Sequence, residues 1–531
     1  MTEADGRLIT ERLFEIATSD PDKELIVDPV FGRFSYAETA ALVRRAACGL
    51  RRHGFGPGDV VIIQLPNWAP FLIFHMALTC IGAVTGNIPF VYRRYEVSRI
   101  LELTRAKGLV VPSEFRGFDF VTMARALRST HECLTHVFVV GDSTVREEDT
   151  LVDYTTLLGE ATAPELEALA GLQPRFDDIT AIGFTSGTTG DLKGATFDTL
   201  VLNAVNQGFV DRYDLDANDR IFGCSPLGHA VGFTHALRLT LTIGGSIALQ
   251  EHWDPAHAVA AIHQEQCTFL AAATPFLIDI VNQPALAEHE NLPSLRIFLC
   301  GGASVPAQLV KDARQRLPHT FTSPLWGMTE CGGVTTCPFD APAEKFYTTD
   351  GKPCESMELK VVDGDGKTLP PGQEGELMAR GPMVARGYFR QPELTAEYFL
   401  ADGFFRTGDQ ARMDQDGYIK ITGRIKDLII RGGVNISPVE IENVLFSHPA
   451  IENVAVIGAP EPRLGERACA FVTLKPGAML NLQDVQAWMS EAGVAKPKWP
   501  EQLEIVATLP MTASGKIQKF RLREMLAQSA G

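Results

Sequence analysis

Short runs of apolar residues alternate with longer amphipathic stretches through most of the first 330 residues of the chain. The segments 36–53 and 255–266 repeat with a helical period, whereas the apolar runs have the length of buried strands. This alternation predicts mostly parallel sheets covered by helices, and the number of units favours two sheets over one. The expected strands lie at residues 60–63, 108–111, 136–140, 181–184, 246–249, 267–272 and 297–300.

The pattern changes from about residue 351 onward. The segments 357–363 and 374–380 have the length and alternation of strands, and a tight Asp-Gly-Asp-Gly turn ends the first of them. We expect a small β-subdomain at about residues 345–423 that completes a large N-terminal domain, residues 1–423. The remaining chain, 424–531, predicts a separate α+β domain with helices at 438–447, 481–491 and 519–527 and strands at 451–457, 467–474 and 502–506.

One stretch resembles a membrane span, because no charged residue lies between Asp59 and Arg93. Pro66, Pro70 and Pro89 divide it into short pieces, whereas a membrane helix needs about 20 uninterrupted apolar residues. A buried strand, an apolar helix and a second strand fit this stretch better. We therefore expect no membrane span.

The charge balance is acidic, with 48 Lys and Arg against 65 Asp and Glu in 531 residues and a net charge of −17. This balance argues against a protein that mainly binds nucleic acid or anionic lipid, since both require basic surfaces. The acidity is uneven: residues 424–531 hold 12 basic and 11 acidic residues, so the first 423 have a net charge of −18. The ten cysteines form no C-x-x-C pair, and the N-terminus shows no signal-peptide pattern, so we expect reduced thiols and a cytoplasmic protein.

The segment Thr185-Ser-Gly-Thr-Thr-Gly-Asp-Leu-Lys-Gly194 follows an expected strand. Its glycines and hydroxyl residues suit a loop whose backbone N–H groups surround a phosphate. The spacing differs from a Walker loop, because Lys193 follows Gly190 by three residues and is followed by glycine. By itself the segment is equally compatible with a Gly/Thr-rich turn that binds nothing.

Further motifs follow this loop in a fixed order, and together they resemble the adenylate-forming superfamily, which includes acyl-CoA synthetases, peptide-synthetase adenylation domains and beetle luciferases. Leu192 differs from the family's usual proline in the loop. The matching segments after the loop are Gly301-Gly-Ala303, Trp326-Gly-Met-Thr-Glu330, Gly375-Glu-Leu377, Arg406-Thr-Gly-Asp409, Gly417-Tyr-Ile-Lys-Ile-Thr-Gly-Arg-Ile-Lys426, Arg431-Gly-Gly433 and Pro510-Met-Thr-Ala-Ser-Gly-Lys516.

The resemblance implies an α/β fold in which two doubly wound αβαβα subdomains and a small β-barrel subdomain are followed by a mobile α+β lid. It also implies a two-step reaction. A carboxylic acid attacks the α-phosphate of ATP, with Mg²⁺ bound, to give an acyl-adenylate and pyrophosphate. Coenzyme A then takes the acyl group and AMP leaves. Small-molecule substrates are the expected partners, and a homodimer is the assembly we consider.

The resemblance also assigns roles to residues. Lys516, Thr185, Glu330 and His229 are the implied catalytic residues, and Thr185 with Glu330 would hold Mg²⁺. Taken singly, Glu330 and Lys516 would be read as a helix cap and a surface charge; their joint spacing favours the functional interpretation. The implied nucleotide site comprises Thr185, Ser186, Gly187, Thr188, Thr189, Gly190, Lys193, Gly302, Ala303, Ser304, Trp326, Gly327, Met328, Thr329, Glu330, Asp409, Arg424 and Lys516.

The segments expected around the acyl group hold small and apolar side chains and no charge, which favours a hydrophobic acid: medium-chain, alicyclic or bulky polycyclic. His229 is read either as a gate or as a core histidine bonded to a backbone carbonyl. The sequence looks most like medium-chain and cyclohexanecarboxylate CoA ligases. The expected acyl pocket comprises His229, Phe233, Ala273, Thr274, Cys300, Gly301, Gly302, Trp326, Gly327 and Met328.

Lys426 occupies the position of the family's hinge, where the lid would rotate between the two steps. Arg431, Gly432 and Gly433 are candidates for the coenzyme A tunnel. Three alternatives stay open at this point: a stand-alone adenylating enzyme that passes its product to a carrier protein or partner ligase, a luciferase-like oxygenase, and a non-catalytic binding protein.

Overall fold

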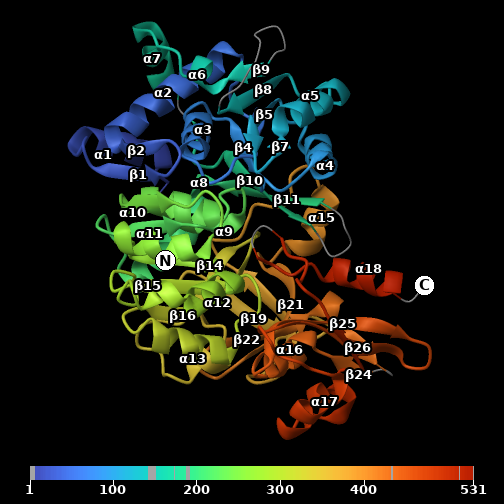
Figure 1. Ribbon diagram of the computed structural model, residues 1–531. Helices are drawn as coiled ribbons and strands as arrows, with labels where there is room; N and C mark the ends of the chain where they lie inside the picture. Colours follow the sequence, from blue (N-terminus) through green and yellow to red (C-terminus); the bar gives the residue numbers. More distant parts are fainter. Residues whose placement is uncertain are drawn as a thin grey trace.

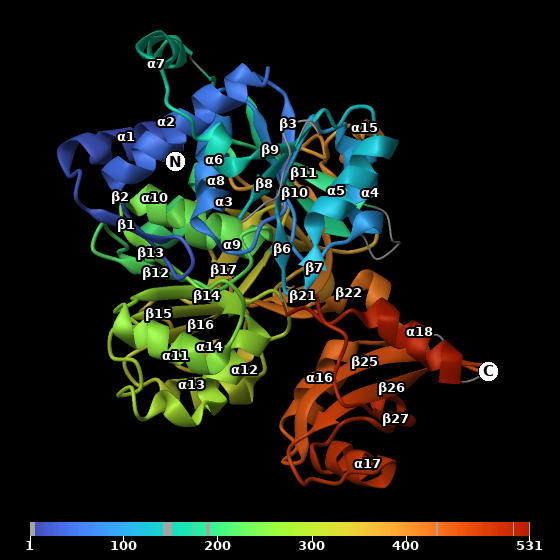
Figure 2. The ribbon, with the colours of Figure 1, turned by 45° about the horizontal axis from the view of Figure 1, so that its top comes forward.

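The computed structural model describes residues 6–141, 151–172, 174–186, 192–431, 434–512 and 515–529. It confirms a mixed α/β architecture with a large N-terminal part and a smaller C-terminal part, which lies at the lower right in Figures 1 and 2. Two large sheets, a four-stranded sheet and a five-stranded sheet form the framework. The two large sheets agree with the prediction of two sheets rather than one.

The first large sheet has seven strands and is parallel except where β10 meets β11. The charge-free stretch supplies β3, α3 and β4, and every residue of these three elements is buried. Burial on both faces explains why the stretch is apolar throughout. The strand order is β11 (Leu192–Asp198), β10 (Ile179–Ser186), β4 (Val84–Asn87), β3 (Val60–Ile63), β5 (Gly108–Pro112), β8 (His136–Val140) and β9 (Leu151–Asp153).

The second large sheet has nine strands, which come from residues 24–353 of the chain. An N-terminal hairpin, β1–β2, pairs in parallel with β13, although more than 200 residues separate them in the chain. The sequence pattern did not reveal this long-range pairing. The order is β18 (Lys352–Pro353), β17 (Gly332–Thr336), β16 (Phe321–Met328), β15 (Ile297–Gly301), β14 (Phe269–Ala273), β12 (Arg220–Gly223), β13 (Ser246–Leu249), β1 (Glu24–Asp28) and β2 (Gly32–Ser35).

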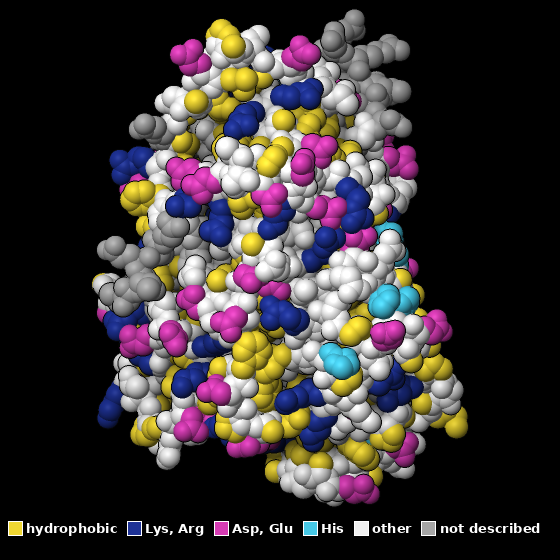
Figure 3. Space-filling model, turned by 90° about the vertical axis from the view of Figure 1, so that its left-hand side faces the viewer, with side chains coloured by type: hydrophobic (Ala, Val, Ile, Leu, Met, Phe, Trp, Pro, Cys, Tyr) yellow, Lys and Arg dark blue, Asp and Glu magenta, His cyan; other side chains and the backbone are white. Residues whose placement is uncertain are grey.

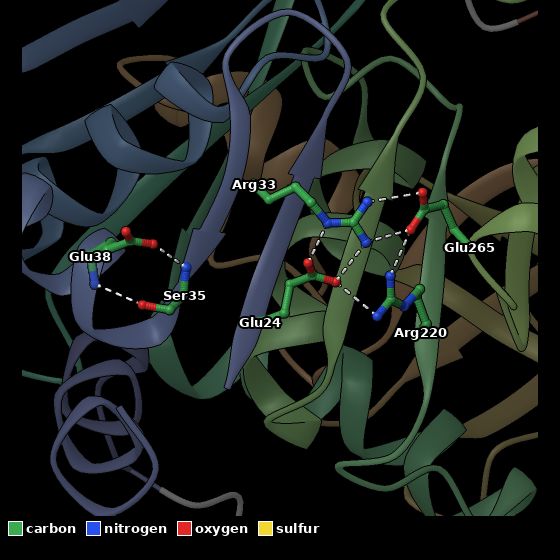
Figure 4. A network of polar contacts seen from close by, with 6 residues as sticks. All are labelled: Glu24, Arg33, Ser35, Glu38, Arg220 and Glu265. Atoms are coloured by element: carbon green, nitrogen blue, oxygen red, sulfur yellow. Dashed lines mark hydrogen bonds and ion pairs between the residues drawn. The ribbon is translucent and has the colours of Figure 1, made fainter. Parts of the chain in front are cut away.

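Two arginines and two glutamates, in alternation, join the N-terminal hairpin to the rest of the second sheet (Figure 4). Arg33 contacts Glu24 at 2.6 Å and Glu265 at 2.8 Å, and Arg220 contacts the same two carboxylates at 2.8 and 3.0 Å. Each guanidinium thus lies between two carboxylates, a geometry in which bidentate pairs add specificity. The network fixes the hairpin against β12 and the end of α11 (Pro255–Gln264).

The chain continues with a small antiparallel sheet and then with the C-terminal domain. Four strands pair antiparallel in linear order and form an open sheet: β19 (Glu358–Val362), β20 (Glu374–Arg380), β21 (Phe405–Met413) and β22 (Ile419–Arg424). The C-terminal domain has its own buried core. Its strands are β23 (Ile429–Arg431), β24 (Val434–Ile436), β25 (Ile451–Glu461), β26 (Gly465–Leu474) and β27 (Gln502–Ile505); its helices are α16 (Pro438–Phe446), α17 (Leu482–Glu491) and α18 (Lys519–Ser529).

Helices cover both large sheets, and no helix in the described ranges is long and apolar enough to cross a membrane. The ten cysteines are free thiols, as expected. On the face in Figure 3, basic and acidic side chains are interspersed. The longer helices of the N-terminal part are α1 (Ile9–Ser19), α2 (Tyr36–Arg52), α3 (Ala69–Cys80), α4 (Arg94–Thr104), α5 (Phe120–Thr130), α7 (Ala163–Ala170), α8 (Thr199–Tyr213), α12 (Thr274–Asn282), α13 (Ala307–Arg316) and α15 (Pro392–Tyr398).

Candidate active site

The two large sheets meet at the ends of β10 and β16. A Cβ atom on Gly183 would lie 2.9 Å from Cγ2 of Thr329, so only glycine permits this approach without a shift. Thr185 follows Gly183 by two residues, and Glu330 follows Thr329 directly. The meeting of the sheets therefore brings together two segments that the sequence motifs assigned to the same site.

Lys193 belongs to a strand rather than to the loop before it. It pairs with Thr185 in the antiparallel β10–β11 hairpin, and its side chain is 9% exposed. Its ammonium lies 3.6 Å from the ring centroid of Tyr398 and 5.1 Å from that of Tyr388. These aromatic faces attract the cation and fix its position. Gly187, Thr188, Thr189 and Gly190 lie outside the described residues, as does the side chain of Ser186.

Glu330 is a buried carboxylate with a defined partner. It is 4% exposed, and its Oε1 accepts a hydrogen bond of 3.0 Å from the hydroxyl of Tyr388. Burial and the charge of Glu330 raise the pKa of Tyr388, so the phenol stays a hydrogen-bond donor. Tyr388 thus orients Glu330 while its ring faces Lys193.

The oxygen ligands Thr185 and Glu330 suit Mg²⁺, which binds one or two carboxylates together with phosphate oxygens and water. Within the described ranges, no group of three or more His, Cys, Asp or Glu side chains could hold a metal ion. One hydroxyl and one carboxylate are a donor set that fits a magnesium ion whose other ligands are phosphate oxygens and water.

Asp409 is held from two sides. Its Oδ2 accepts a hydrogen bond of 2.8 Å from the indole Nε1 of Trp326, and its Oδ1 accepts one of 3.1 Å from Nε of Arg424. The carboxylate is 5% exposed. A carboxylate can accept about four hydrogen bonds, so acceptor capacity remains for a ligand's hydroxyls.

Lys516 reaches this cluster from the C-terminal domain. It follows Gly515, whose φ of +78° and close approach to Pro275 of α12 favour glycine; a Cβ there would lie 3.2 Å from Cγ of Pro275. The charge of Arg424 and desolvation by the surrounding protein lower the pKa of Lys516 to about 8, while Asp409 and Glu330 act in the opposite direction. Four implied site residues, from the second large sheet, the β-subdomain and the lid, therefore influence one another.

The segment after β15 contacts the lid directly. The hydroxyl of Ser304 hydrogen-bonds to Oδ1 of Asn443, on α16, at 3.0 Å. Gly302 and Ala303 are exposed beside it, and Gly302 has a φ of +79°. These residues lie at the boundary between the core and the C-terminal domain, where the resemblance places the nucleotide.

A small cavity of about 20 Å³ lies beside the meeting point of the sheets, with room for roughly one water molecule. Of the residues predicted around the acyl group, Phe233 lines this cavity, whereas Ala273, Thr274, Cys300, Gly301, Gly302, Trp326, Gly327 and Met328 do not. The residues that line it are Asn87, Gly183, Phe184, Phe197, Leu202, Val205, Gly228, Ala230, Phe233, Thr234, Thr329 and Gly332.

His229 lies between two cavity residues, Gly228 and Ala230. Its Nδ1 is buried and has no hydrogen-bond partner. Desolvation and the charge of Lys516 lower the pKa of His229 to about 4, so the ring is neutral at pH 7. The unpaired Nδ1 argues against a core histidine satisfied by a backbone carbonyl through that atom.

The hinge and coenzyme A candidates lie outside this cluster. Lys426 is exposed in the 3₁₀ turn Ile425–Asp427, and Asp427 pairs with Arg523 of α18 at 3.1 Å. Arg431 pairs with Glu501 at 2.7 Å within the C-terminal domain. Gly432 and Gly433 lie outside the described residues.

Sequence reasoning missed the residues that support this site. Tyr388, Tyr398 and Asn443 hold implied site residues but stand in no Gly-rich or charged motif. Leu202 and Val205 of α8 line the cavity, yet their spacing is that of any buried helix face. Only the fold reveals these contacts.

The comparisons with known proteins agree with this geometry. Residues 13–389 match the family model described as AMP-binding enzyme, and residues 440–516 match the AMP-binding enzyme C-terminal domain. A medium-chain fatty-acid–CoA ligase of Escherichia coli (strain K12) is 36% identical over 520 residues, which cover 96% of this chain and 89% of that protein. A salicyl-AMP ligase/salicyl-S-ArCP synthetase of Mycobacterium tuberculosis is 33% identical over 534 residues, 99% of this chain and 92% of that protein.

The crystal structure of the anthranilate CoA ligase AuaEII in complex with anthranoyl-AMP is similar throughout. Its TM-score is 0.89 at 25% sequence identity, with 99% of this chain and 98% of that chain covered. The family match over more than half of the sequence, the shared fold and the clustered motif residues lead to one conclusion. The chain belongs to the AMP-binding enzyme family, and thus to the adenylate-forming superfamily that includes the AMP-forming acyl-CoA ligases.

Proposed function

We propose that the chain is a ligase that activates a hydrophobic carboxylic acid with ATP and transfers the acyl group to coenzyme A. The observation that supports this most strongly is that the charges of Arg424, Asp409 and Glu330, all in the core or at its boundary, act on the pKa of Lys516 in the lid. An acyl-adenylate forms when two anions approach, so a cation at this point offsets their repulsion.

In the proposed first step, the substrate carboxylate attacks the α-phosphorus of ATP and pyrophosphate leaves. Asp409, oriented by Trp326 and Arg424, would accept hydrogen bonds from the ribose hydroxyls. Lys516 would stabilise the charge that develops on the α-phosphate, and Lys193 would contact the departing phosphates. Mg²⁺, held through Thr185 and Glu330, supplies positive charge at the phosphate oxygens when bound.

The acid would enter beside His229 and Phe233. The cavity lining there is mainly aliphatic and aromatic, which favours a medium-chain, alicyclic or bulky polycyclic acid. His229 is neutral near pH 7 and adds no charge at the entrance. The small volume of the cavity requires side chains such as Phe233 to move when the acid binds.

In the proposed second step, residues 424–531 rotate as a lid about Lys426 and the thiol of coenzyme A attacks the acyl carbonyl, releasing AMP. The exposed Lys426 can change its backbone angles without losing a buried contact. Arg431, with Gly432 and Gly433, would then line the thiol tunnel.

A second candidate acceptor is an acyl carrier protein, because the Mycobacterium tuberculosis relative is named as a ligase that forms a salicyl-S-ArCP product. Pyrophosphate release should be measured across linear, alicyclic and polycyclic acids, with and without coenzyme A. Acid-dependent release with acyl-CoA as product supports the proposal. Release without acyl-CoA at any concentration of coenzyme A would favour the carrier-protein acceptor.

A further inference from the structure

An arginine is completely buried near the acyl cavity. Arg238 ends the π-helix Phe233–Arg238 and is 0% exposed. Its Nη1 lies 3.1 Å from Nε2 of His75, and its Nη2 donates to Oδ1 of Asn203 at 3.2 Å. Its Nε is buried and has no partner. Burial lowers the pKa of Arg238 to about 9, so the guanidinium is still charged at pH 7.

The neighbours of Arg238 do not neutralise it. Arginine can only donate, so Nε2 of His75 must accept, and the proton of the neutral ring lies on Nδ1, which donates to Oγ1 of Thr85 at 3.0 Å. Burial and the charge of Arg238 hold the pKa of His75 well below its usual value, so His75 remains neutral. Among the described residues, no carboxylate forms an ion pair with Arg238.

One aromatic ring separates this cluster from the cavity. Phe233 lines the cavity and packs edge-on against His75, with 4.7 Å between ring centroids. Thr85 and Asn87 are two residues apart in β4 and so face the same side of the sheet. Asn87 also lines the cavity, and its Oδ1 is buried without a hydrogen-bond partner. The wall of the cavity beyond Phe233 is therefore polar.

The polar wall adjoins the strand that carries Gly183: Asn87 pairs with Gly183, and Gly183 and Thr329 line the same cavity. The charge of Lys516 acts on His229, which precedes Phe233 by four residues, and the cavity extends from Gly228 and Ala230 to Phe233. A substrate whose carboxylate faces Lys516 and whose body fills this cavity would bring its other end to Phe233, behind which Arg238 lies.

An uncompensated buried charge and an unpaired buried amide oxygen are both costly to a fold. A ligand that supplies the missing partners removes that cost. We propose that Arg238 and Asn87 recognise an oxygen-bearing group, a carbonyl or a second carboxylate, at the end of the acid remote from the reacting carboxyl. Phe233 turns aside to admit this group to the guanidinium. The inference rests on the proposed function and narrows its substrate class from hydrophobic acids to oxo or dicarboxylic acids.

The test compares kcat/KM for acid-dependent pyrophosphate release between matched acids. Octanoic acid is compared with octanedioic acid and with the oxooctanoic acid whose ketone carbonyl adjoins the terminal methyl group. Cyclohexanecarboxylic acid is compared with an oxocyclohexanecarboxylic acid, which carries a ketone on the ring. The proteins are the unmodified chain, Arg238→Met, Asn87→Leu and the control Arg220→Met. The control removes a guanidinium from the charge network of Figure 4 and so leaves the cavity unchanged. Thermal unfolding confirms that each variant is folded.

We expect the unmodified chain to prefer the oxygen-bearing acid in at least one pair, by roughly tenfold, since a site built for a polar group rejects the analogue that lacks it. Arg238→Met and Asn87→Leu should abolish this preference, and Arg220→Met should keep it. If kcat/KM is higher for the dicarboxylic acid than for the oxo acid, the group that Arg238 and Asn87 recognise is a second carboxylate. If kcat/KM is higher for the oxo acid, that group is a carbonyl.

A preference for the plain acid in every pair, or a ratio unchanged in both cavity variants, would overturn the inference while leaving the proposed function intact. If Arg238→Met does not fold, an unchanged ratio in Asn87→Leu is sufficient to overturn it. Absence of pyrophosphate release with every acid would instead overturn the proposed function, and with it this inference.

Discussion

The indole N–H of Trp326 donates a hydrogen bond of 2.8 Å to the carboxylate of Asp409, which joins β16 of the second large sheet to β21 of the β-subdomain. Both side chains are buried, at 7% and 5% exposure. The resemblance to the adenylate-forming family implies that Trp326 faces the adenine of the nucleotide and that Asp409 faces its ribose. The bond therefore couples the two parts of the proposed nucleoside site.

Replacing Trp326 with Phe keeps an aromatic face but removes this hydrogen bond. A hydrogen bond to a charged group contributes about 1.5–3 kcal/mol. We expect the KM for ATP to rise by roughly tenfold to a hundredfold, with a smaller change in kcat. Steady-state kinetics of pyrophosphate release at varied ATP measures this effect.

Trp68→Phe is the matched control, because Trp68 is 6% exposed and donates its indole N–H to Oε1 of Glu251 at 2.6 Å, outside the proposed nucleotide site. It should lower thermal stability without changing the KM for ATP. Equal changes in KM for the two variants would show that the Trp326 bond acts only through stability.

The pKa of Lys516 predicts an alkaline loss of activity. In the free protein this pKa is lowered to about 8, so the ammonium is present below that pH and is lost above it. Because the proposed adenylation uses the charged form, kcat/KM for pyrophosphate release should fall as the pH rises through about 8. Lys516→Arg stays charged, and its profile should lack this fall whatever its absolute rate. A fall at the same pH in Lys516→Arg would assign the titration to another group.

Lys426→Pro tests the hinge. Proline fixes φ, so the lid could not turn about this residue. Acyl-CoA formation should slow far more than pyrophosphate release, and Lys426→Ala, which keeps the backbone free, should slow neither substantially. Equal losses of both half-reactions in Lys426→Pro would rule out the hinge role.

Tyr388→Phe tests the orientation of Glu330. The change removes the 3.0 Å hydrogen bond but keeps a ring near Lys193. Loss of an outer partner of a metal ligand typically costs 10–100-fold in metal affinity, so the Mg²⁺ concentration for half-maximal rate should rise by about tenfold. Tyr398→Phe keeps the ring beneath Lys193 and should leave the Mg²⁺ dependence unchanged. The same dependence in Tyr388→Phe and the unmodified chain would contradict this role.

Much of the fold could be predicted because its signals are local. The apolar runs correspond to the buried strands of both large sheets, and the C-terminal helices lie within one or two residues of their predicted bounds. The N-terminal hairpin β1–β2 was not predicted, since its partner β13 is distant in the chain. Pairing at such a distance depends on the whole fold rather than on local periodicity.

The site could be predicted only as far as its motifs extend. Trp326, Asp409 and Arg424 stand in motifs, and hydrogen bonds join them in the structure. Lys193 was expected among loop amides, but it is a strand residue beneath two tyrosine rings. The segments expected around the acyl group hold no charge, and Arg238 lies outside them, one ring away from the cavity. Neither position can be read from sequence spacing, because each depends on side chains from distant strands and helices.

The most direct test of the proposed ligase activity is the product balance of a reaction with ATP, Mg²⁺, coenzyme A and the best acid of the panel. Mass spectrometry should find AMP and acyl-CoA in equal amounts, acyl-adenylate when coenzyme A is omitted, and a rate lower by about 10²–10³ in Lys516→Ala, the cost of removing a charge-stabilising donor. Formation of ADP in place of AMP, or acyl-CoA formation at an undiminished rate in Lys516→Ala, would contradict the account.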